Sequence, residues 1–138
     1  MLFIPITIGA AALQVARLRV VCGTEGPQTA ELTLTVDGVE KAATATGDGP
    51  VDAVFNAIRE IAPHTADLAL FQVHAVTEGT DAQAQVSVRL EEDGRIASGQ
   101  AADTDTLVAA AKAYVGALNN LAARREKAAP EAMAASGF

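Results

Sequence analysis

Aromatic side chains are scarce in this sequence: they make up 4% of its residues, and tryptophan is absent. Proteins that bind single-stranded nucleic acids stack bases on such rings, so this class of function is disfavoured. Cys22 is the only cysteine, which excludes an internal disulfide and a cysteine-based metal cluster. A lone thiol is compatible with the reducing cytosol, and we expect a cytoplasmic protein whose core is filled by Ala, Val and Leu.

Basic residues are also in the minority, with 10 Lys and Arg against 17 Asp and Glu and a formal charge of -7. That balance opposes binding to nucleic-acid phosphates and to anionic membranes. The apolar stretch of residues 1–12 has no basic residue and is too short to span a bilayer. We interpret it as a lead-in segment, of the kind that truncation or cloning of a longer protein leaves.

What the sequence does contain is an internal repeat. With Gly23 placed on Gly79, the two halves align without a gap, and the matches fall where the backbone must turn. Gly23-Thr24-Glu25 meets Gly79-Thr80-Asp81, and Asp37-Gly38 meets Asp93-Gly94. A chain of 138 residues, half of them hydrophobic, is by size one domain, so the repeat lies within that domain.

Each half is predicted to contain three strands and then a helix. Apolar and polar residues alternate in the strands, the Asp-Gly pairs are typical of tight hairpin turns, and apolar residues then recur at helical spacing. The expected strands are Leu13–Val21, Glu31–Val36, Lys41–Thr46, Leu68–Val76, Gln85–Leu90 and Ile96–Ala101. The expected helices are Val51–Ile61 and Leu107–Leu121.

These elements predict an α+β fold of two β-β-β-α units related by a pseudo-two-fold axis, with the helices packed on antiparallel sheets. Three strands and one helix cannot cover their own apolar faces, so the two units should pack together. Apolar surface left over would suit a second chain, and we expect a homodimer. The units should span about 13–62 and 68–123 within a folded domain of residues 13–123, and residues 124–138 should form a flexible tail.

The link between the third strand and the first helix, Gly47-Asp48-Gly49-Pro50, is a candidate ligand site. Pro50 suits the first position of a helix, and the two glycines permit close approach to the backbone. Free amides at a helix start favour a negative group such as the carboxylate of an amino acid. A tight turn without a ligand explains the same residues. A nucleotide is disfavoured because Val51-Asp52-Ala53 follows instead of Gly-Lys-Ser/Thr.

Other candidates for chemistry have simpler explanations. Asp103 or Asp105 can cap the second helix, which is a commoner role than catalysis by paired carboxylates. His64 and His74 lack the spacing and the partners of a metal site. Asp81 follows a turn, where it could bond its own backbone or face the ammonium group of an amino acid. We expect no metal, no cofactor and no catalysis by this chain alone.

Five short motifs occur in order along the chain: Gly47-Asp48-Gly49-Pro50-Val51-Asp52-Ala53, Gly79-Thr80-Asp81-Ala82-Gln83-Ala84, Ala102-Asp103-Thr104-Asp105, Ala111-Lys112-Ala113-Tyr114 and Ala117-Leu118-Asn119. Together they resemble the C-terminal regulatory domain of 2-isopropylmalate synthases. The resemblance covers about residues 13–123, nearly the whole part that we expect to be ordered.

The resemblance implies a sensor that is separate from its enzyme. In that family a (β/α)8 barrel condenses acetyl-CoA with 2-oxoisovalerate in leucine biosynthesis, and leucine bound to the C-terminal domains at the dimer interface inhibits it. A barrel alone takes about 250 residues, so 138 residues cannot hold it together with this domain. The implied partners are leucine, a second copy of the domain and the catalytic barrel.

Position by position, the resemblance places the effector pocket on several separate segments. The implied residues are Gly47, Asp48, Gly49 and Val51 at the first helix start, Leu68, Phe71 and Ala75 on the fourth strand, then Ala82 and Ala84, and Thr106 at the second helix start. Asp48 or Asp81 would face the ammonium group. The sequence departs from the family pattern at Phe71, where Tyr is frequent, and at Thr106, where Ile is common.

The sequence leaves three alternatives to a leucine sensor. Citramalate synthases share this domain and would imply isoleucine as the effector. A dimerisation module without a ligand fits the departures at Phe71 and Thr106. A small stand-alone enzyme that uses Asp103, Asp105 or His74 is disfavoured, because no nucleophile, base and orienting group can be picked out together.

Overall fold

The computed structural model describes the backbone of residues 13–75 and 83–136, and the side chains of residues 13–74 and 83–123. Two three-stranded antiparallel sheets, of strand order β1-β2-β3 and β4-β5-β6, are each followed by a helix. The predicted α+β fold of two β-β-β-α units is therefore confirmed. The elements are β1 (Leu13–Val21), β2 (Gln28–Val36), β3 (Val39–Gly47), α1 (Pro50–Ile61), β4 (Asp67–Ala75), β5 (Ala84–Glu92), β6 (Arg95–Asp103) and α2 (Thr106–Ser136).

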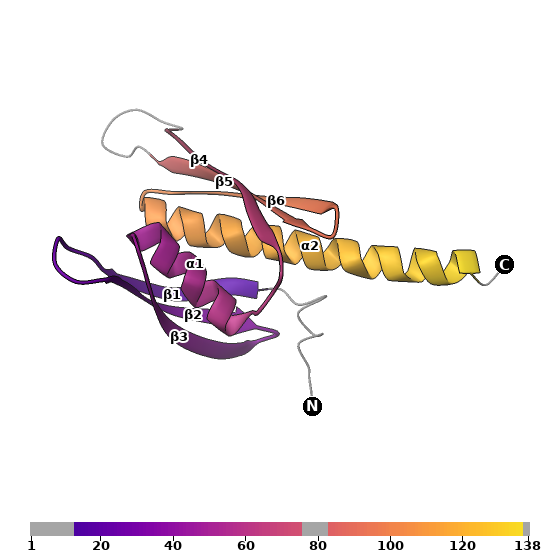
Figure 1. Cartoon of the computed structure of the whole chain (residues 1–138), viewed down its shortest axis with the longest axis horizontal. Coiled ribbons are helices and arrows are strands. Elements are labelled where there is room, and N and C mark those ends of the chain that lie inside the picture. The colour runs from indigo at the N-terminus through magenta and orange to yellow at the C-terminus, as the bar shows by residue number, and fades with distance from the viewer. Residues whose placement is uncertain (1–12, 76–82, 137–138) are drawn as a thin grey trace.

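The two helices lie between the two sheets (Figure 1). α1 packs on β2 and β3, α2 packs on β5 and β6, and the two helices contact each other. α2 also contacts β1, so the second helix packs on both units. Alternation along the strands explains this arrangement, because Leu32 and Leu34 of β2 are buried whereas Glu31 beside Leu32 is exposed. The prediction that the helices cover one face of each sheet is confirmed.

A single offset between the halves describes most of the repeat but not its first strand. The offset that places Gly23 on Gly79 also places the starts of β2, β3 and α1 on those of β5, β6 and α2. It does not place Leu13, where β1 begins, on Asp67, where β4 begins. The gapless alignment is therefore wrong for the opening strands. The difference arises in the connections, since residues 22–27 join β1 to β2 and the longer segment 76–83 joins β4 to β5.

Both Asp-Gly pairs form the predicted hairpin turns. Asp37 and Gly38 have φ angles of 51° and 82°, and Asp93 and Gly94 have 52° and 79°. Two consecutive positive φ values characterise the type I′ turn, whose twist matches that of the flanking strands. Val36 then pairs with Val39 across the first turn.

α2 is longer than the sequence analysis expected. Its backbone is helical through Ser136, past residue 123, and its last turns extend beyond both sheets (Figure 1). Ala, Arg, Lys and Glu dominate residues 122–136, and these residue types have high helix propensity. Among the described residues, no helix is both long and apolar enough to cross a bilayer.

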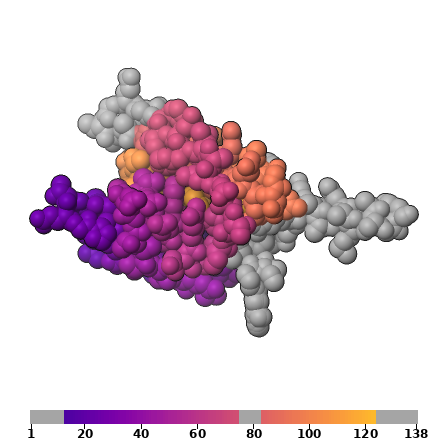
Figure 2. All heavy atoms as spheres, viewed as in Figure 1, coloured from indigo at the N-terminus to yellow at the C-terminus, as the bar shows by residue number. Residues whose placement is uncertain are grey.

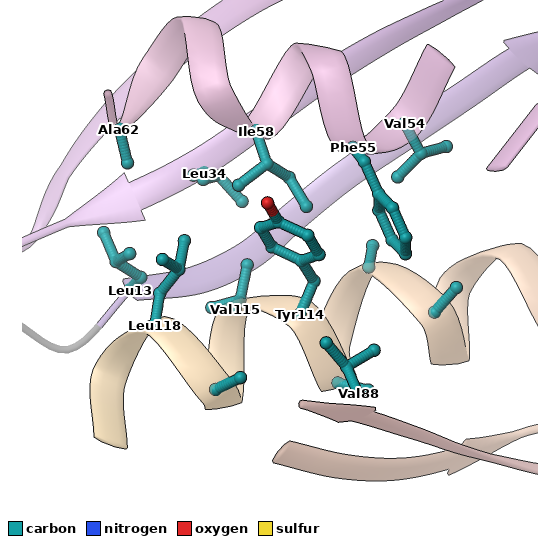
Figure 3. Packing of buried hydrophobic residues seen from close by; sticks show 14 of the residues in the cluster. Leu13, Leu34, Val54, Phe55, Ile58, Ala62, Val88, Tyr114, Val115 and Leu118 are labelled. Carbon is teal, nitrogen blue, oxygen red and sulfur yellow. The ribbon is translucent and has the colours of Figure 1, made fainter. Parts of the chain in front are cut away.

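The core lies where the two helices meet, and both units contribute to it (Figure 3). Val54, Phe55 and Ile58 of α1 face Tyr114 and Val115 of α2. All five are buried, and Tyr114 is the largest fully buried side chain. The labelled residues of the two helices follow one another in the same direction across Figure 3, so the helices start at the same end of the molecule.

Candidate functional site

The first candidate segment is the start of α1, where the backbone leaves amides available. Gly49 is the N-cap, with extended backbone (φ -151°, ψ 173°) and no side-chain cap, and Pro50 follows at the first helical position. The first hydrogen bond within α1 runs from the Ala53 amide to the Gly49 carbonyl at 2.9 Å. The Val51 and Asp52 amides consequently have no carbonyl partner inside the helix. Together with the helix dipole, they favour a negative group at this end.

The two glycines of this segment differ in what surrounds them. A Cβ atom on Gly47 would lie 2.5 Å from the Ala53 amide nitrogen and 2.7 Å from the Asp52 Oδ2 atom, so the end of β3 and the start of α1 require glycine there. A Cβ atom on Gly49 would meet nothing within 4 Å. The Asp52 carboxylate accepts a hydrogen bond from the Asp48 amide at 3.1 Å. Open space beside the backbone is therefore found at Gly49 and not at Gly47.

The second candidate segment is the inner face of β4, an edge strand. Leu68, Phe71 and Val73 pair with buried residues of β5, so all three lie on the sheet face that carries the helix. A bulge between Leu68 and Leu70 brings Leu68 and Phe71 to the same face in spite of their odd spacing. Leu68 is nevertheless 40% exposed and Val73 45% exposed. α2 packs on β5 and β6, which leaves an apolar strip open along β4.

Phe55 brings these two segments into contact. It follows Val51 by one helical turn, and its ring meets that of Phe71 edge to face, with centroids 5.7 Å apart and an angle of 84°. Figure 2 shows α1 and β4 adjacent on one face of the molecule, with gold atoms of α2 visible between them. The start of α1 and the apolar strip of β4 thus border a common surface.

The third candidate segment lies at the start of α2. Ala84 pairs with Asp103 on one side and with Ala75 on the other, which places this segment beside the end of β4. Asp105 caps α2 by accepting hydrogen bonds from the amides of Leu107 (2.8 Å) and Val108 (3.4 Å). Thr106, the first helical residue, is exposed.

The sequence predicted that Asp103 or Asp105 caps α2, and in the structure only Asp105 does so. The Asp105 amide donates to the Asp103 carboxylate at 2.9 Å, and this bond, with help from Lys112, holds the pKa of Asp103 below its usual value. Both carboxylates are thus explained by local backbone structure. This confirms capping as the role of Asp105 and gives Asp103 a different one.

The structure places the described residues that the sequence singled out in two groups. In the first group, Phe55 links the start of α1 to Phe71. The second group consists of Ala75 at the end of β4, Ala84 at the start of β5 and Thr106 at the start of α2. Asp81 and Ala82 lie outside the described residues. The exposed carboxylate of Asp48 is the candidate ammonium partner within them.

Two apolar residues of this region, Phe55 and Val73, were missed by the sequence analysis. Helical spacing from Val51 points to Phe55, and alternation from Phe71 points to Val73. Neither pattern tells a residue of the general core from one that borders a site.

Among the side chains that the structure describes, in residues 13–74 and 83–123, no group of three or more His, Cys, Asp or Glu converges in a way that could hold a metal ion. His64 bonds to Tyr114, while His74 is exposed on β4. Cys22 is exposed near the end of β1.

Comparison with known proteins places this arrangement in a family. The family model described as the LeuA allosteric (dimerisation) domain matches residues 6–122. A 2-isopropylmalate synthase of Caulobacter vibrioides (strain NA1000 / CB15N) is 75% identical over 130 residues, which cover 94% of this chain and 25% of that protein. One of Nitrobacter hamburgensis is 56% identical over 124 residues, covering 90% of this chain and 24% of that protein. The chain spans about a quarter of the length of these relatives. The chain therefore belongs to the LeuA allosteric (dimerisation) domain family, as the regulatory domain of a 2-isopropylmalate synthase.

Proposed function

We propose that this domain senses leucine for the catalytic part of a 2-isopropylmalate synthase, which condenses acetyl-CoA with 2-oxoisovalerate in the cytoplasm. Leucine would lie between the start of α1 and the apolar strip of β4, and its binding would inhibit the distant catalytic site. The observation that carries this proposal is the position of the partly exposed Phe71 against Phe55, one helical turn from the open amides at Val51.

The chemistry of the two segments suits an apolar amino acid. The Val51 and Asp52 amides would receive its carboxylate, and the exposed Asp48 carboxylate its ammonium group. Its isobutyl group would lie against Phe71 and gain about 2 kcal/mol from leaving water. Backbone amides and one carboxylate suffice for these contacts, and we propose that the domain needs no cofactor.

A second copy of the domain would complete the site. Leu68 and Val73, at 40% and 45% exposure, lie on the edge strand of their sheet, where neither helix covers them. Apolar surface at a sheet edge is costly to leave in water, and a two-fold related copy is the commonest way to cover it. We therefore propose a homodimer whose interface includes the strip on β4.

One observation favours the alternative of a dimerisation module without a ligand. The Asp52 carboxylate already lies in the first turn of α1, where it accepts the Asp48 amide and supplies negative charge to the helix start. A ligand carboxylate would have to bind beside this charge. The alternative of an isoleucine sensor shares all the contacts proposed above and differs only in the branching of the apolar group.

Isothermal titration with leucine, isoleucine and valine tests the ligand. We expect selective heat with leucine, weakened at least tenfold in Gly49→Ala, because the added methyl group would occupy the open space beside the backbone. Gly116→Ala is the matched control, since its Cβ would also meet no close neighbour, lying 3.7 Å from the Gly99 Cα atom on the face of α2 that packs on β6. No heat and no thermal shift at millimolar leucine would refute the proposal, and a preference for isoleucine would indicate a citramalate synthase domain.

Sedimentation of the same protein tests the dimer. We expect a dimer that Val73→Lys dissociates, because a buried unpaired ammonium group is costly. Val39→Lys is the control, since Val39 is 58% exposed on the edge strand of the other sheet. Equal dissociation by both variants, or by neither, would argue against an interface on β4.

A further inference from the structure

The Phe and Tyr side chains among the described residues form one continuous row through the core. The Phe71 ring on β4 meets the Phe55 ring on α1, with centroids 5.7 Å apart. Phe55 meets Tyr114 on α2 at 4.5 Å and an angle of 38°. Tyr114 in turn meets His64 at 5.7 Å between centroids, with its hydroxyl oxygen 3.0 Å from the Nε2 atom. We call this row of four rings the aromatic row.

The far end of the aromatic row is attached to the linker between the units. The Ala66 amide donates to the His64 Nδ1 atom at 3.2 Å. In the neutral ring the proton therefore lies on Nε2, which donates to the Tyr114 hydroxyl oxygen. Because Nδ1 bonds the linker's own backbone and Nε2 bonds α2, the position of the His64 ring reports the position of the linker relative to α2.

The linker, residues 62–66, is held by the second unit at a second point. Thr65 donates its hydroxyl hydrogen to the Glu92 carboxylate at the end of β5, at 2.8 Å. Ala62 and Ala66 are buried, at 2% and 4% exposure. The linker is thus packed against the second unit, so a displacement of Tyr114 would also displace the linker.

We propose that the aromatic row couples the ligand site at Phe71 to this linker, so that ligand binding changes how the two units are held together. The inference rests on the proposed function, because it takes Phe71 as a wall of the leucine site. Packed interiors have no free volume to absorb a ring displacement, and edge-to-face contacts have preferred geometries. A ligand that reorients Phe71 therefore displaces Phe55, which lies against Tyr114.

Tyr114 is the residue at which this coupling can be interrupted with least damage. Its ring is fully buried between Phe55 and His64, and its hydroxyl makes the link to the linker. Tyr114→Phe retains the ring and its packing and removes only the hydroxyl. Leu34→Val serves as its control, because it also trims a fully buried side chain but lies on β2, in the other sheet and outside the row.

The test is a leucine titration followed by NMR at two reporters, the Val51 amide beside the proposed site and the His64 ring at the other end of the row. We expect leucine to shift both reporters in the unmodified protein. In Tyr114→Phe the His64 shift should largely disappear while the Val51 shift remains, and Leu34→Val should keep both.

The outcomes separate the two proposals. A shift at Val51 without one at His64 in the unmodified protein would overturn the coupling and leave the leucine site standing. No shift at either reporter would contradict the leucine site. The coupling is then decided without ligand by a double-mutant cycle of Phe71→Leu and His64→Gln on the free energy of unfolding, where non-additivity that disappears in a Tyr114→Phe background supports it and additivity overturns it.

Discussion

Gly99 of β6 lies directly against Gly116 of α2, with no side chain between the strand and the helix. A Cβ atom on Gly99 would overlap the Ala113 carbonyl oxygen and the Ala117 amide nitrogen. A Cβ atom on Gly116 would lie 3.7 Å from the Gly99 Cα atom, which is an ordinary contact. The close packing of α2 on its sheet therefore depends on one of these glycines and not on the other.

Gly99→Ala should destabilise the domain by about 1 to 3 kcal/mol or more, because the methyl group has only backbone to displace. Gly116→Ala should be neutral or stabilising by up to about 1 kcal/mol, because alanine is the better helix former. Urea unfolding monitored by circular dichroism measures both. Equal losses in the two variants would show that the helix lies differently on β6.

Asp105→Ala should lower the free energy of unfolding by about 1 kcal/mol, because the side chain accepts the Leu107 and Val108 amides at the start of α2. Asp105→Asn keeps the accepting oxygen and should recover most of the loss. Thermal unfolding of the three proteins gives the comparison. If alanine and asparagine cost the same, the carboxylate charge and not the capping bond supports the helix start.

The Tyr114 hydroxyl should ionise at a higher pH than an exposed tyrosine does. Burial raises its pKa above the usual value of 10.0, and Arg59 nearby opposes part of this effect. The folded state then binds the phenolic proton more tightly than the unfolded state. The contribution of protonated Tyr114 to the free energy of unfolding is therefore complete below pH 10, and it is lost as the pH rises from 10 through the raised pKa of the folded protein. Tyr114→Phe should lack this alkaline loss.

The sequence makes the Tyr114 measurement simple. Because Tyr114 is the only tyrosine and tryptophan is absent, the ultraviolet absorbance of tyrosinate reports this group alone. A midpoint at or below 10 in the folded protein would contradict the burial of the hydroxyl beside His64.

Asn119 should hold the start of β1 on α2. Its side-chain amide accepts the Leu13 amide at 2.9 Å and donates to the Leu13 carbonyl at 3.0 Å, as a neighbouring strand would. Asn119→Ala removes both bonds and should cost about 1 to 3 kcal/mol, with faster hydrogen exchange at Leu13. Asn120→Ala is the control, because exposed Asn120 makes a single bond to Ser98. Unchanged exchange at Leu13 in Asn119→Ala would refute the clamp.

Local sequence patterns predicted the elements of this fold well, because they reflect properties of short segments. Alternation in β2 and β5, the Asp-Gly turns and the Pro at the start of α1 each depend on a few neighbouring residues. The same patterns could not choose between Asp103 and Asp105 as the cap, since both can reach a helix start. The gapless alignment of the halves failed for β1 and β4, because it assumes that the connections after these strands have equal lengths.

The candidate site was predicted only as separate pieces. The glycines before α1 were identified from the chemistry of a helix start, and the apolar residues of β4 were identified from the resemblance to a family. Contact between the pieces depends on Phe55, whose helical spacing marks it only as a core residue. The distinction between Gly47, which packs against Asp52 and Ala53, and Gly49, which faces open space, needs the positions of all neighbouring atoms.

By itself, then, the sequence determined the two β-β-β-α units, the polar outer faces of the strands, the hairpin turns and the family. The tertiary structure decided that α2 packs on both units, that the strip on β4 stays open, and that Phe71, Phe55, Tyr114 and His64 meet. The physical reason is the range of the interactions: periodicity and turn preference act over a few residues, whereas ring contacts and the exposure of a strand edge depend on segments far apart in the sequence, as His64 and Tyr114 are.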